Sequence, residues 1–316
     1  MHAELLVPGV TVGLNALLEM RHRLAELQLF SAPGRRSPLV GLHHSKLRGR
    51  GVDFDQVRVY QAGDDVRNID WRVTARTQEP HTKLFHEERE RPVFLLVEQS
   101  PQLFFGSGLC FKSVLAAQVA ALFGWAALAH NDRIGGLVFN AAQCSEVRPR
   151  RSKQSLLQLL GLLVRANQAL AGTPASTESA GSGLALALRR AREVLRPGSL
   201  ALAVCDERSL DDGAELQLGL LARHCDLILL PVSDPLDHAL PAAGLLRFAD
   251  RHARLELDSG DAALRQAWHA RGAERAERWQ RLAQRLGILL LPLSTQHELL
   301  AQLREQVQPA QRSRQP

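Results

Sequence analysis

The sequence is short of several residues and motifs that mark common functional classes. Aromatic residues make up only 5% of the chain, with a single tyrosine, while leucine and alanine are frequent, which favours helices. The four cysteines show no CxxC or other metal-binding spacing. The GxGxxG, GxxxxGKS/T and GxSxG patterns are also absent, so the usual dinucleotide, P-loop and esterase signatures are excluded.

Signals for export and for membrane insertion are lacking as well. The N-terminus has no basic segment followed by an apolar run and a cleavage site. The longest apolar stretch, residues 114–129, contains Gln118 and is short for a bilayer-spanning helix. We therefore expect no membrane span.

Positive charge is in moderate excess and is concentrated near one end. The chain has 39 Lys and Arg against 33 Asp and Glu, a formal net charge of +6. From Arg265 onwards there are nine Arg and four Glu, a net +5, so nearly all of the excess lies there. Such a segment suits nucleic acid, an anionic membrane surface or an acidic partner, and charge alone does not choose between them.

The stretch from Gly49 to Gly106 is the most distinctive part of the chain. Residues 53–76 mix five Asp and four Arg with apolar and aromatic residues, and the second half of the stretch runs into an apolar segment long enough for a buried strand. Because aromatic side chains favour burial, we expect the charges to be partly buried with them. Gly63, which precedes two Asp residues, predicts a turn in which glycine adopts a backbone angle that other residues avoid.

Several spaced motifs in this stretch resemble a bacterial family, domain-of-unknown-function family fifty-eight (DUF58). They are RVY at 58–60, GDDVR at 63–67, IDW at 69–71, TAR at 74–76 and EER at 87–89. The resemblance implies a domain similar to the von Willebrand factor A fold, with the signature segment placed before it. Many relatives carry membrane helices before the signature and this chain does not, which points to the cytoplasm.

Beyond residue 92 the sequence predicts strands that alternate with helices. The expected strands are 93–97, 133–139, 144–147, 200–204, 227–232 and 288–291, and the expected helices are 110–130, 153–170, 184–195, 210–224, 262–286 and 295–306. This alternation predicts an α/β domain with a mainly parallel sheet and helices on both faces.

We divide the chain into four parts on these grounds. An N-terminal helix extends to residue 30, and a signature segment of short strands and turns covers 31–91. The von Willebrand A-like domain covers 92–306, and a polar, disordered tail follows at 307–316.

A candidate cation site lies at the carboxyl ends of the predicted strands, where ligands bind in open α/β sheets. The resemblance implies an Asp-x-Ser-x-Ser loop, helped by a Thr and an Asp from later loops, and its matches here are Glu98, Ser100, Gln102, Thr177 and Asp206. Glu98 and Gln102 replace smaller ligands, and magnesium tolerates displaced ligands poorly. We therefore expect a degenerate site without useful magnesium affinity, and expect Glu98→Asp with Gln102→Ser to restore some. The alternative is that Ser100 and Asp206 simply cap helices.

The charged signature residues have two interpretations. The favoured one is an ion-pair network in which Asp64 and Asp65 pair with arginines and pin the segment to the sheet. The full set of signature residues is Arg58, Tyr60, Gly63, Asp64, Asp65, Arg67, Asp70, Trp71 and Arg76. Removing Asp65 or Arg67 from such a partly buried network would cost about 3–5 kcal/mol. The alternative is a catalytic site in which Asp64 and Asp65 are paired carboxylates, one with a raised pKa.

The predicted helix 262–286 carries an arginine stripe: Arg271, Arg275, Arg278, Arg281 and Arg285. Most such stripes are the solvated rim of a buried helix. The alternative is a docking face, in which case charge reversal at Arg271 and Arg278 would weaken binding and leave stability nearly intact.

The most consistent function is that of a non-enzymatic, cytoplasmic protein-interaction module without a cofactor. The resemblance implies a MoxR-type AAA ATPase as partner, in an assembly or chaperone-like step. One alternative is a metal-dependent adhesion module with a working cation site. Another is a hydrolase or nuclease that uses the region of Asp64 and Asp65.

Overall fold

The computed structural model describes residues 8–24, 53–86, 92–172, 181–249 and 254–312. The chain divides into two compact units. Residues 41–90 form the smaller unit, and residues 1–40 together with 91–316 form the larger unit.

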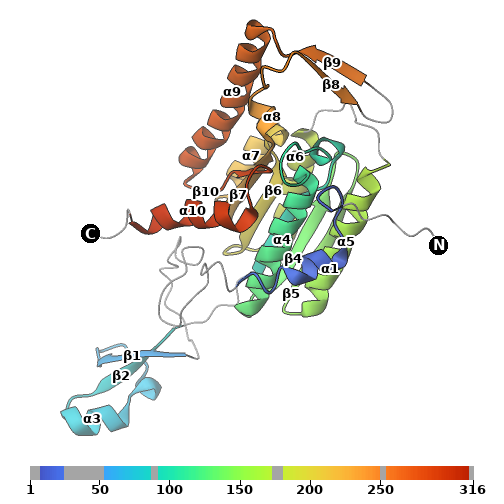
Figure 1. Cartoon of the computed structure of the whole chain (residues 1–316). Helices are drawn as coiled ribbons and strands as arrows, with labels where there is room; N and C mark the ends of the chain where they lie inside the picture. The colour runs from blue at the N-terminus through green and yellow to red at the C-terminus, as the bar shows by residue number, and fades with distance from the viewer. Residues whose placement is uncertain (1–7, 25–52, 87–91, 173–180, 250–253, 313–316) are drawn as a thin grey trace. The chain divides into compact units, whose positions relative to one another are not determined.

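A seven-stranded sheet forms the centre of the larger unit (Figure 1). Its strands are β3 (Pro92–Glu98), β4 (Arg133–Phe139), β5 (Cys144–Arg150), β6 (Leu200–Asp206), β7 (Asp226–Ser233), β10 (Leu289–Leu290) and β11 (Leu293–Ser294). The order is β10-β7-β6-β3-β4-β5, with β11 also on β7, and every pairing is parallel except that of β4 with β5. The chain thus starts in the middle of the sheet and winds first to one side and then to the other. This order confirms the predicted von Willebrand factor A-like class.

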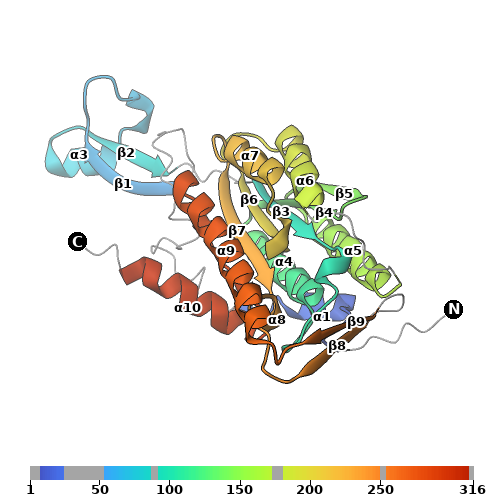
Figure 2. The same ribbon diagram turned by 90° about the horizontal axis from the view of Figure 1, so that it is seen from above.

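Helices cover both faces of this sheet (Figure 2). One face carries α1 (Leu14–Glu19), α4 (Lys112–Ala129), α5 (Lys153–Leu170) and α10 (Leu299–Arg312). The other carries α6 (Gly181–Val194), α7 (Asp212–Leu221) and α9 (Ala262–Leu286). The covered faces explain why the central parts of β3, β6 and β7 are continuous apolar runs, since both sides of each strand are buried.

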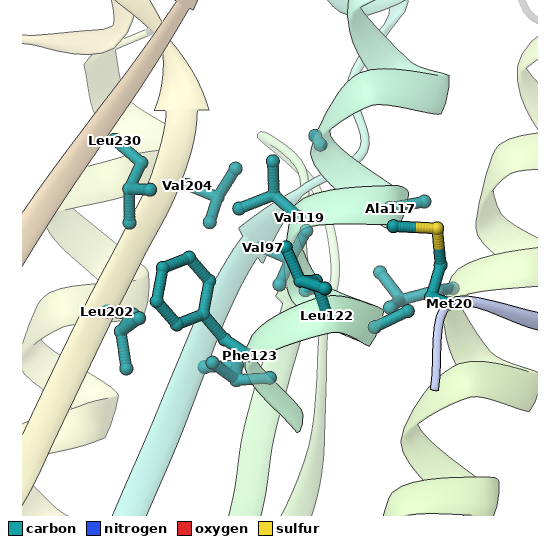
Figure 3. Packing of buried hydrophobic residues seen from close by; sticks show 14 of the residues in the cluster. Met20, Val97, Ala117, Val119, Leu122, Phe123, Leu202, Val204 and Leu230 are labelled. Carbon is teal, nitrogen blue, oxygen red and sulfur yellow. The ribbon is translucent and has the colours of Figure 1, made fainter. Parts of the chain in front are cut away.

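Alternate residues of each central strand enter different cores, because successive side chains of a strand point to opposite faces. In β3, Leu95 and Val97 pack on the α4 side, and Phe94 and Leu96 pack on the α6 and α7 side. Figure 3 shows the first of these cores, in which side chains of α4 such as Phe123 meet the sheet.

Helix α4 is the apolar centre of that core. By length and composition it is the one described helix able to cross a membrane, but 83% of this stretch is buried inside the protein. A core helix of an α/β domain passes the same test, so the composition is weak evidence for a span. This near-complete burial is typical of a helix that is apolar on nearly all sides.

The predicted helices 153–170 and 262–286 agree with α5 and α9 to the residue. The last predicted helix does not agree, since α10 begins at Leu299 and continues to Arg312, beyond the boundary placed at 306. It begins late because residues 293–294 still pair with β7 and the Thr295 N–H donates to Ser233. The segment from 307 was predicted as a tail, and the backbone is helical up to Arg312.

A short helix and a two-stranded ribbon of the larger unit had no counterpart in the sequence analysis. The short helix α8 (Pro235–His238) follows β7, and β8 (Leu245–Ala249) pairs with β9 (Arg254–Asp258) as a separate antiparallel ribbon. Most residues of this ribbon are exposed. Residues 254–258 (RLELD) do alternate polar and apolar residues, so the signal for a strand was present there and was not used.

The smaller unit is built on one antiparallel pair, β1 (Asp53–Val59) with β2 (His81–His86). Between them lie a 3-10 turn, residues 66–68, and helix α3 (Trp71–Thr77). The signature was predicted to hold strands and turns, and α3 was missed. Asp70 starts this helix as its N-cap, with its carboxylate accepting the N–H groups of Arg72 and Val73.

Gly136 in β4 is a position where any side chain would meet the main chain of β3. A Cβ atom there would lie 2.4 Å from the carbonyl oxygen of Leu95. We expect Gly136→Ala to lower the free energy of unfolding by about 1–3 kcal/mol, as overpacking of a dense core does. Denaturant titration of the purified variant measures this.

Gly161 in α5 provides the matched control, since its Cβ would meet no atom closer than 3.7 Å. Gly161→Ala should leave stability unchanged or raise it by up to about 1 kcal/mol, because alanine favours helix. A Gly136→Ala variant as stable as Gly161→Ala would contradict the proposed close approach.

Candidate functional site

Two buried carboxylates meet at the centre of the sheet. Glu98 ends β3 and Asp206 ends β6, and these strands are neighbours in the sheet. The winding of the chain reverses between them, and this is the crevice where open α/β sheets bind ligands. Both residues are almost completely inaccessible to solvent, at 2% and 0% exposure.

The Glu98 carboxylate is surrounded by protein donors. Its Oε1 accepts from Ser100 Oγ and Gln102 Nε2, both at 2.7 Å, and its Oε2 accepts from the Asp206 N–H at 2.9 Å and Ser209 Oγ at 2.7 Å. Burial and the negative charge of Asp206 raise the pKa of Glu98, against these hydrogen bonds. A carboxylate has about four acceptor positions, so Glu98 is already saturated.

Asp206 is balanced by two cations. Lys112 Nζ donates to its Oδ2 at 2.6 Å, and Arg208 Nε donates to its Oδ1 at 2.9 Å. Burial by itself would raise the pKa of Asp206, but the charges of Lys112 and Arg208 outweigh it and bring the pKa down to about 2. Lys112 and Arg208 together therefore keep the Asp206 carboxylate ionised in the interior.

The loop after β7 joins the same cluster. Asp237 in α8 accepts from Lys112 Nζ at 2.9 Å and from the Asp234 N–H at 2.9 Å. Asp234 in turn accepts from the N–H and hydroxyl of Ser107 and from the hydroxyl of Thr295. Burial opposes ionisation of Asp234, and these hydrogen bonds lower its pKa. The cluster thus connects the ends of β6 and β7 with the starts of α4 and the segment before α10.

The structure brings most of the predicted cation ligands together, but their side chains are hydrogen-bonded to protein groups. Glu98, Ser100, Gln102 and Asp206 do lie together, whereas Thr177 lies outside the described residues. Ser100 and Gln102 both donate to Glu98. The Lys112 ammonium lies between Asp206 and Asp237 and donates to both carboxylates. In the described part of the chain, no group of three or more His, Cys, Asp or Glu residues is placed to hold a metal.

A divalent cation therefore does not fit this set of residues while Lys112 keeps its place. The absence of magnesium affinity stays a prediction. The expectation that Glu98→Asp with Gln102→Ser restores binding needs revision, because these changes leave the ammonium where it is. The alternative of simple capping is half right: Asp206 caps the turn that follows it, and the Ser100 hydroxyl bonds Glu98 instead.

Lys112, Asp234 and Asp237 were missed by the sequence analysis, although Lys112 carried a signal. It opens a helix that is apolar for most of its length, with both Lys112 and the following turn buried. A lysine on such a helix needs a buried acidic partner, because an isolated ammonium in the interior is too costly. The sequence did not identify which acidic residue that was.

The signature residues form local caps more than a buried network. Arg58 pairs with Asp64 at 2.7 Å, and Asp65 accepts the Arg67 N–H as the N-cap of the 3-10 turn. The side chains of Arg67 and Arg76 are exposed and make no ion pair with a described residue, and Asp65 is exposed too. The cost of about 3–5 kcal/mol expected at Asp65 and Arg67 does not apply, since it presumes a buried partner.

Two further expectations about the signature have opposite outcomes. Gly63 has φ +107°, which confirms the glycine turn, whereas Trp71 is 70% exposed, so the expected burial of the aromatic residues was wrong for it. Tyr60 is half-buried. The N–H of Gln61 and the Arg58 guanidinium lower the pKa of Asp64, although partial burial opposes them. This is opposite to the shift that a paired catalytic acid requires.

Comparison with known proteins assigns the chain to one family. The family model described as "Protein of unknown function DUF58" matches residues 56–278, from the signature through most of α9. The chain belongs to the DUF58 family. Uncharacterized proteins of Mycobacterium bovis and Mycobacterium tuberculosis are 32% identical to it over 267 residues, which is 84% of this chain and 81% of theirs.

Solved structures resemble this DUF58 protein only distantly. The conserved hypothetical protein BatB from Bacteroides thetaiotaomicron aligns with a TM-score of 0.40 and 12% identity, over 70% of this chain and 99% of its own. The VWA domain of SpRpn10 aligns with a TM-score of 0.30 and 9% identity, over 69% and 95%. The fold assignment rests on the strand order given above.

Most arginines of the stripe in this DUF58 protein bond to other groups of the same protein. Arg278 pairs with Glu215 and Asp212 of α7, and Arg285 also pairs with Glu215. Arg275 donates to the main-chain carbonyl of Asp237, and Arg281 pairs with Glu277 one turn away. Arg271 is exposed and forms no ion pair with a described residue. Most of the stripe therefore holds α9 in place.

Arg278→Glu should destabilise the protein by about 1–2 kcal/mol, because it removes two ion pairs and sets a new carboxylate against Glu215 and Asp212. Arg271→Glu makes the same change of charge on the same helix, at a residue that has no ion pair with a described residue. Its free energy of unfolding should stay within about 0.5 kcal/mol of that of the wild type. Thermal melts compare the two. Equal melting temperatures would show that the α7 contacts contribute nothing.

Proposed function

We propose that this DUF58 protein is a non-enzymatic, cytoplasmic protein-interaction module and that its smaller unit carries the contact surface. The observation that supports this most is the exposure of Trp71. A tryptophan that is 70% exposed on a helix with a firm N-cap is costly to leave in water. Tryptophan is also among the residues that most often dominate binding energy at interfaces.

The surroundings of Trp71 fit a partner of defined chemistry. Val66 is 61% exposed, and Arg67, Arg72 and Arg76 are exposed without ion pairs to described residues. Arg72 and Arg76 are one helical turn apart on α3. Apolar groups flanked by free guanidiniums suit an apolar pocket with carboxylates at its rim.

The proposed partner is a MoxR-type AAA ATPase, in an assembly or chaperone-like step. This follows from the resemblance of the signature motifs to the family, and the acidic-rimmed pocket is the feature such a partner should present to Trp71. An ATP-dependent partner fits the cytoplasmic location that we propose.

The competing functions have weaker support. A metal-dependent adhesion module needs strand-end carboxylates that are free to bind a cation, and those of Glu98 and Asp206 are engaged by protein groups. A hydrolase centred on Asp64 and Asp65 needs an acid with a raised pKa, and that of Asp64 is lowered, chiefly by the Gln61 N–H.

The proposal predicts that Trp71→Ala weakens binding to the purified MoxR-type ATPase by about 2 kcal/mol or more, roughly 30-fold in Kd, as removal of an interface hot spot does. Titration calorimetry or biolayer interferometry measures this. Leu216→Ala on α7 is the control, because Leu216 is similarly exposed, at 62%, but belongs to the larger unit.

Arg72→Glu should also weaken binding, with an effect that shrinks as salt is added. Binding should be insensitive to a chelator of divalent cations, provided that the ATPase is nucleotide-free. Binding that survives both Trp71→Ala and Arg72→Glu would place the contact surface elsewhere. No binding of the wild type would refute this partner.

A further inference from the structure

Lys112 occupies a position that is unfavourable for a cation by itself. It is the first residue of α4, and its side chain has no exposed surface. The amino terminus of a helix carries the positive end of its dipole, so an ammonium there is repelled rather than attracted. Burial adds the loss of hydration, which is the larger cost for an ammonium group.

Two carboxylates offset these costs, and they come from different strand ends. Asp206 ends β6 and Asp237 lies just after β7, and one oxygen of each is within 2.9 Å of Lys112 Nζ. The ammonium therefore lies in front of the carboxyl ends of neighbouring parallel strands, and acidic groups from separate loops converge on it. A single cation at this point joins three segments of the chain.

We propose that the Lys112 ammonium takes the place of a divalent cation at the strand ends of this DUF58 protein, as a positive charge built into the chain. Asp206, which is one of the predicted cation ligands, and Asp237 both accept a hydrogen bond from this ammonium. The site then needs no metal, and it accepts one only when the lysine side chain is removed.

Removing the side chain leaves Asp206 and Asp237 facing the same emptied space. Their oxygens lie 2.6 and 2.9 Å from the point where Nζ stood. Calcium binds oxygen at about 2.3–2.6 Å and magnesium at about 2.0–2.1 Å, so calcium requires the smaller contraction. The site uncovered by the substitution should prefer calcium to magnesium.

The first test compares Lys112→Ala with Lys112→Met by thermal melts, with and without calcium chloride. Both variants lose the ion pairs, so the folding equilibrium should shift toward the unfolded state on the order of a hundredfold to a thousandfold. Calcium should raise the melting temperature of Lys112→Ala in a concentration-dependent manner, as a ligand of the folded state does. The methionine side chain fills the space, so Lys112→Met should not respond.

The second test uses Glu98→Asp with Gln102→Ser, made with Lys112 retained and with Lys112→Ala. Titration calorimetry with calcium and magnesium should detect no binding while the lysine is present, and binding once it is absent. The two proteins share both ligand replacements and differ only at Lys112, so any difference in binding is due to the lysine.

Calcium rescue of Lys112→Ala without rescue of Lys112→Met supports the proposal. Stoichiometric binding of calcium or magnesium by the wild type, or by Glu98→Asp with Gln102→Ser that keeps Lys112, overturns it. If Lys112→Ala does not fold without metal, its refolding yield with and without calcium is the readout, and equal yields overturn the proposal as well.

Discussion

The buried ion pair between Lys112 and Asp206 is the interaction on which the rest of the larger unit depends. A buried pair contributes little net stability compared with apolar groups of the same shape, because desolvation cancels most of the attraction. The loss of one partner is far more costly, since the other charge remains in the interior. The pair therefore acts mainly as a constraint. It admits only arrangements in which the start of α4 meets the ends of β6 and β7.

The sheet supplies the geometry that this constraint needs. The winding reverses between β3 and β6, which leaves a crevice at their ends, and the apolar residues of α4 fill one face of the sheet below it. Glu98, Asp206 and Asp234 then accept hydroxyl and amide donors from the surrounding loops. A crevice that serves as a ligand site in related architectures is closed here by the protein's own groups.

The two units use charge in different ways. In the larger unit, Asp206 is paired with the buried Lys112 and Glu215 with the half-buried Arg278, and Arg275 and Arg278 of α9 are turned toward α8 and α7. In the smaller unit, the carboxylates of Asp64, Asp65 and Asp70 cap turns, and Trp71 and three arginines, Arg67, Arg72 and Arg76, remain exposed. The first pattern suits a rigid scaffold and the second suits recognition, and this contrast underlies the proposed function.

The sequence by itself determined the family, the alternation of strands and helices, the bounds of α5 and α9 and the turn at Gly63. Each of these depends on patterns among residues close in the chain, which periodicity and turn chemistry record. Only the tertiary structure decided the partner of Lys112, which is 94 residues away, the inward use of Arg278 and the exposure of Trp71. These are pairings and burials between distant segments. Their free energies depend on which groups the folded chain brings within a few ångströms, and local sequence patterns do not contain that information.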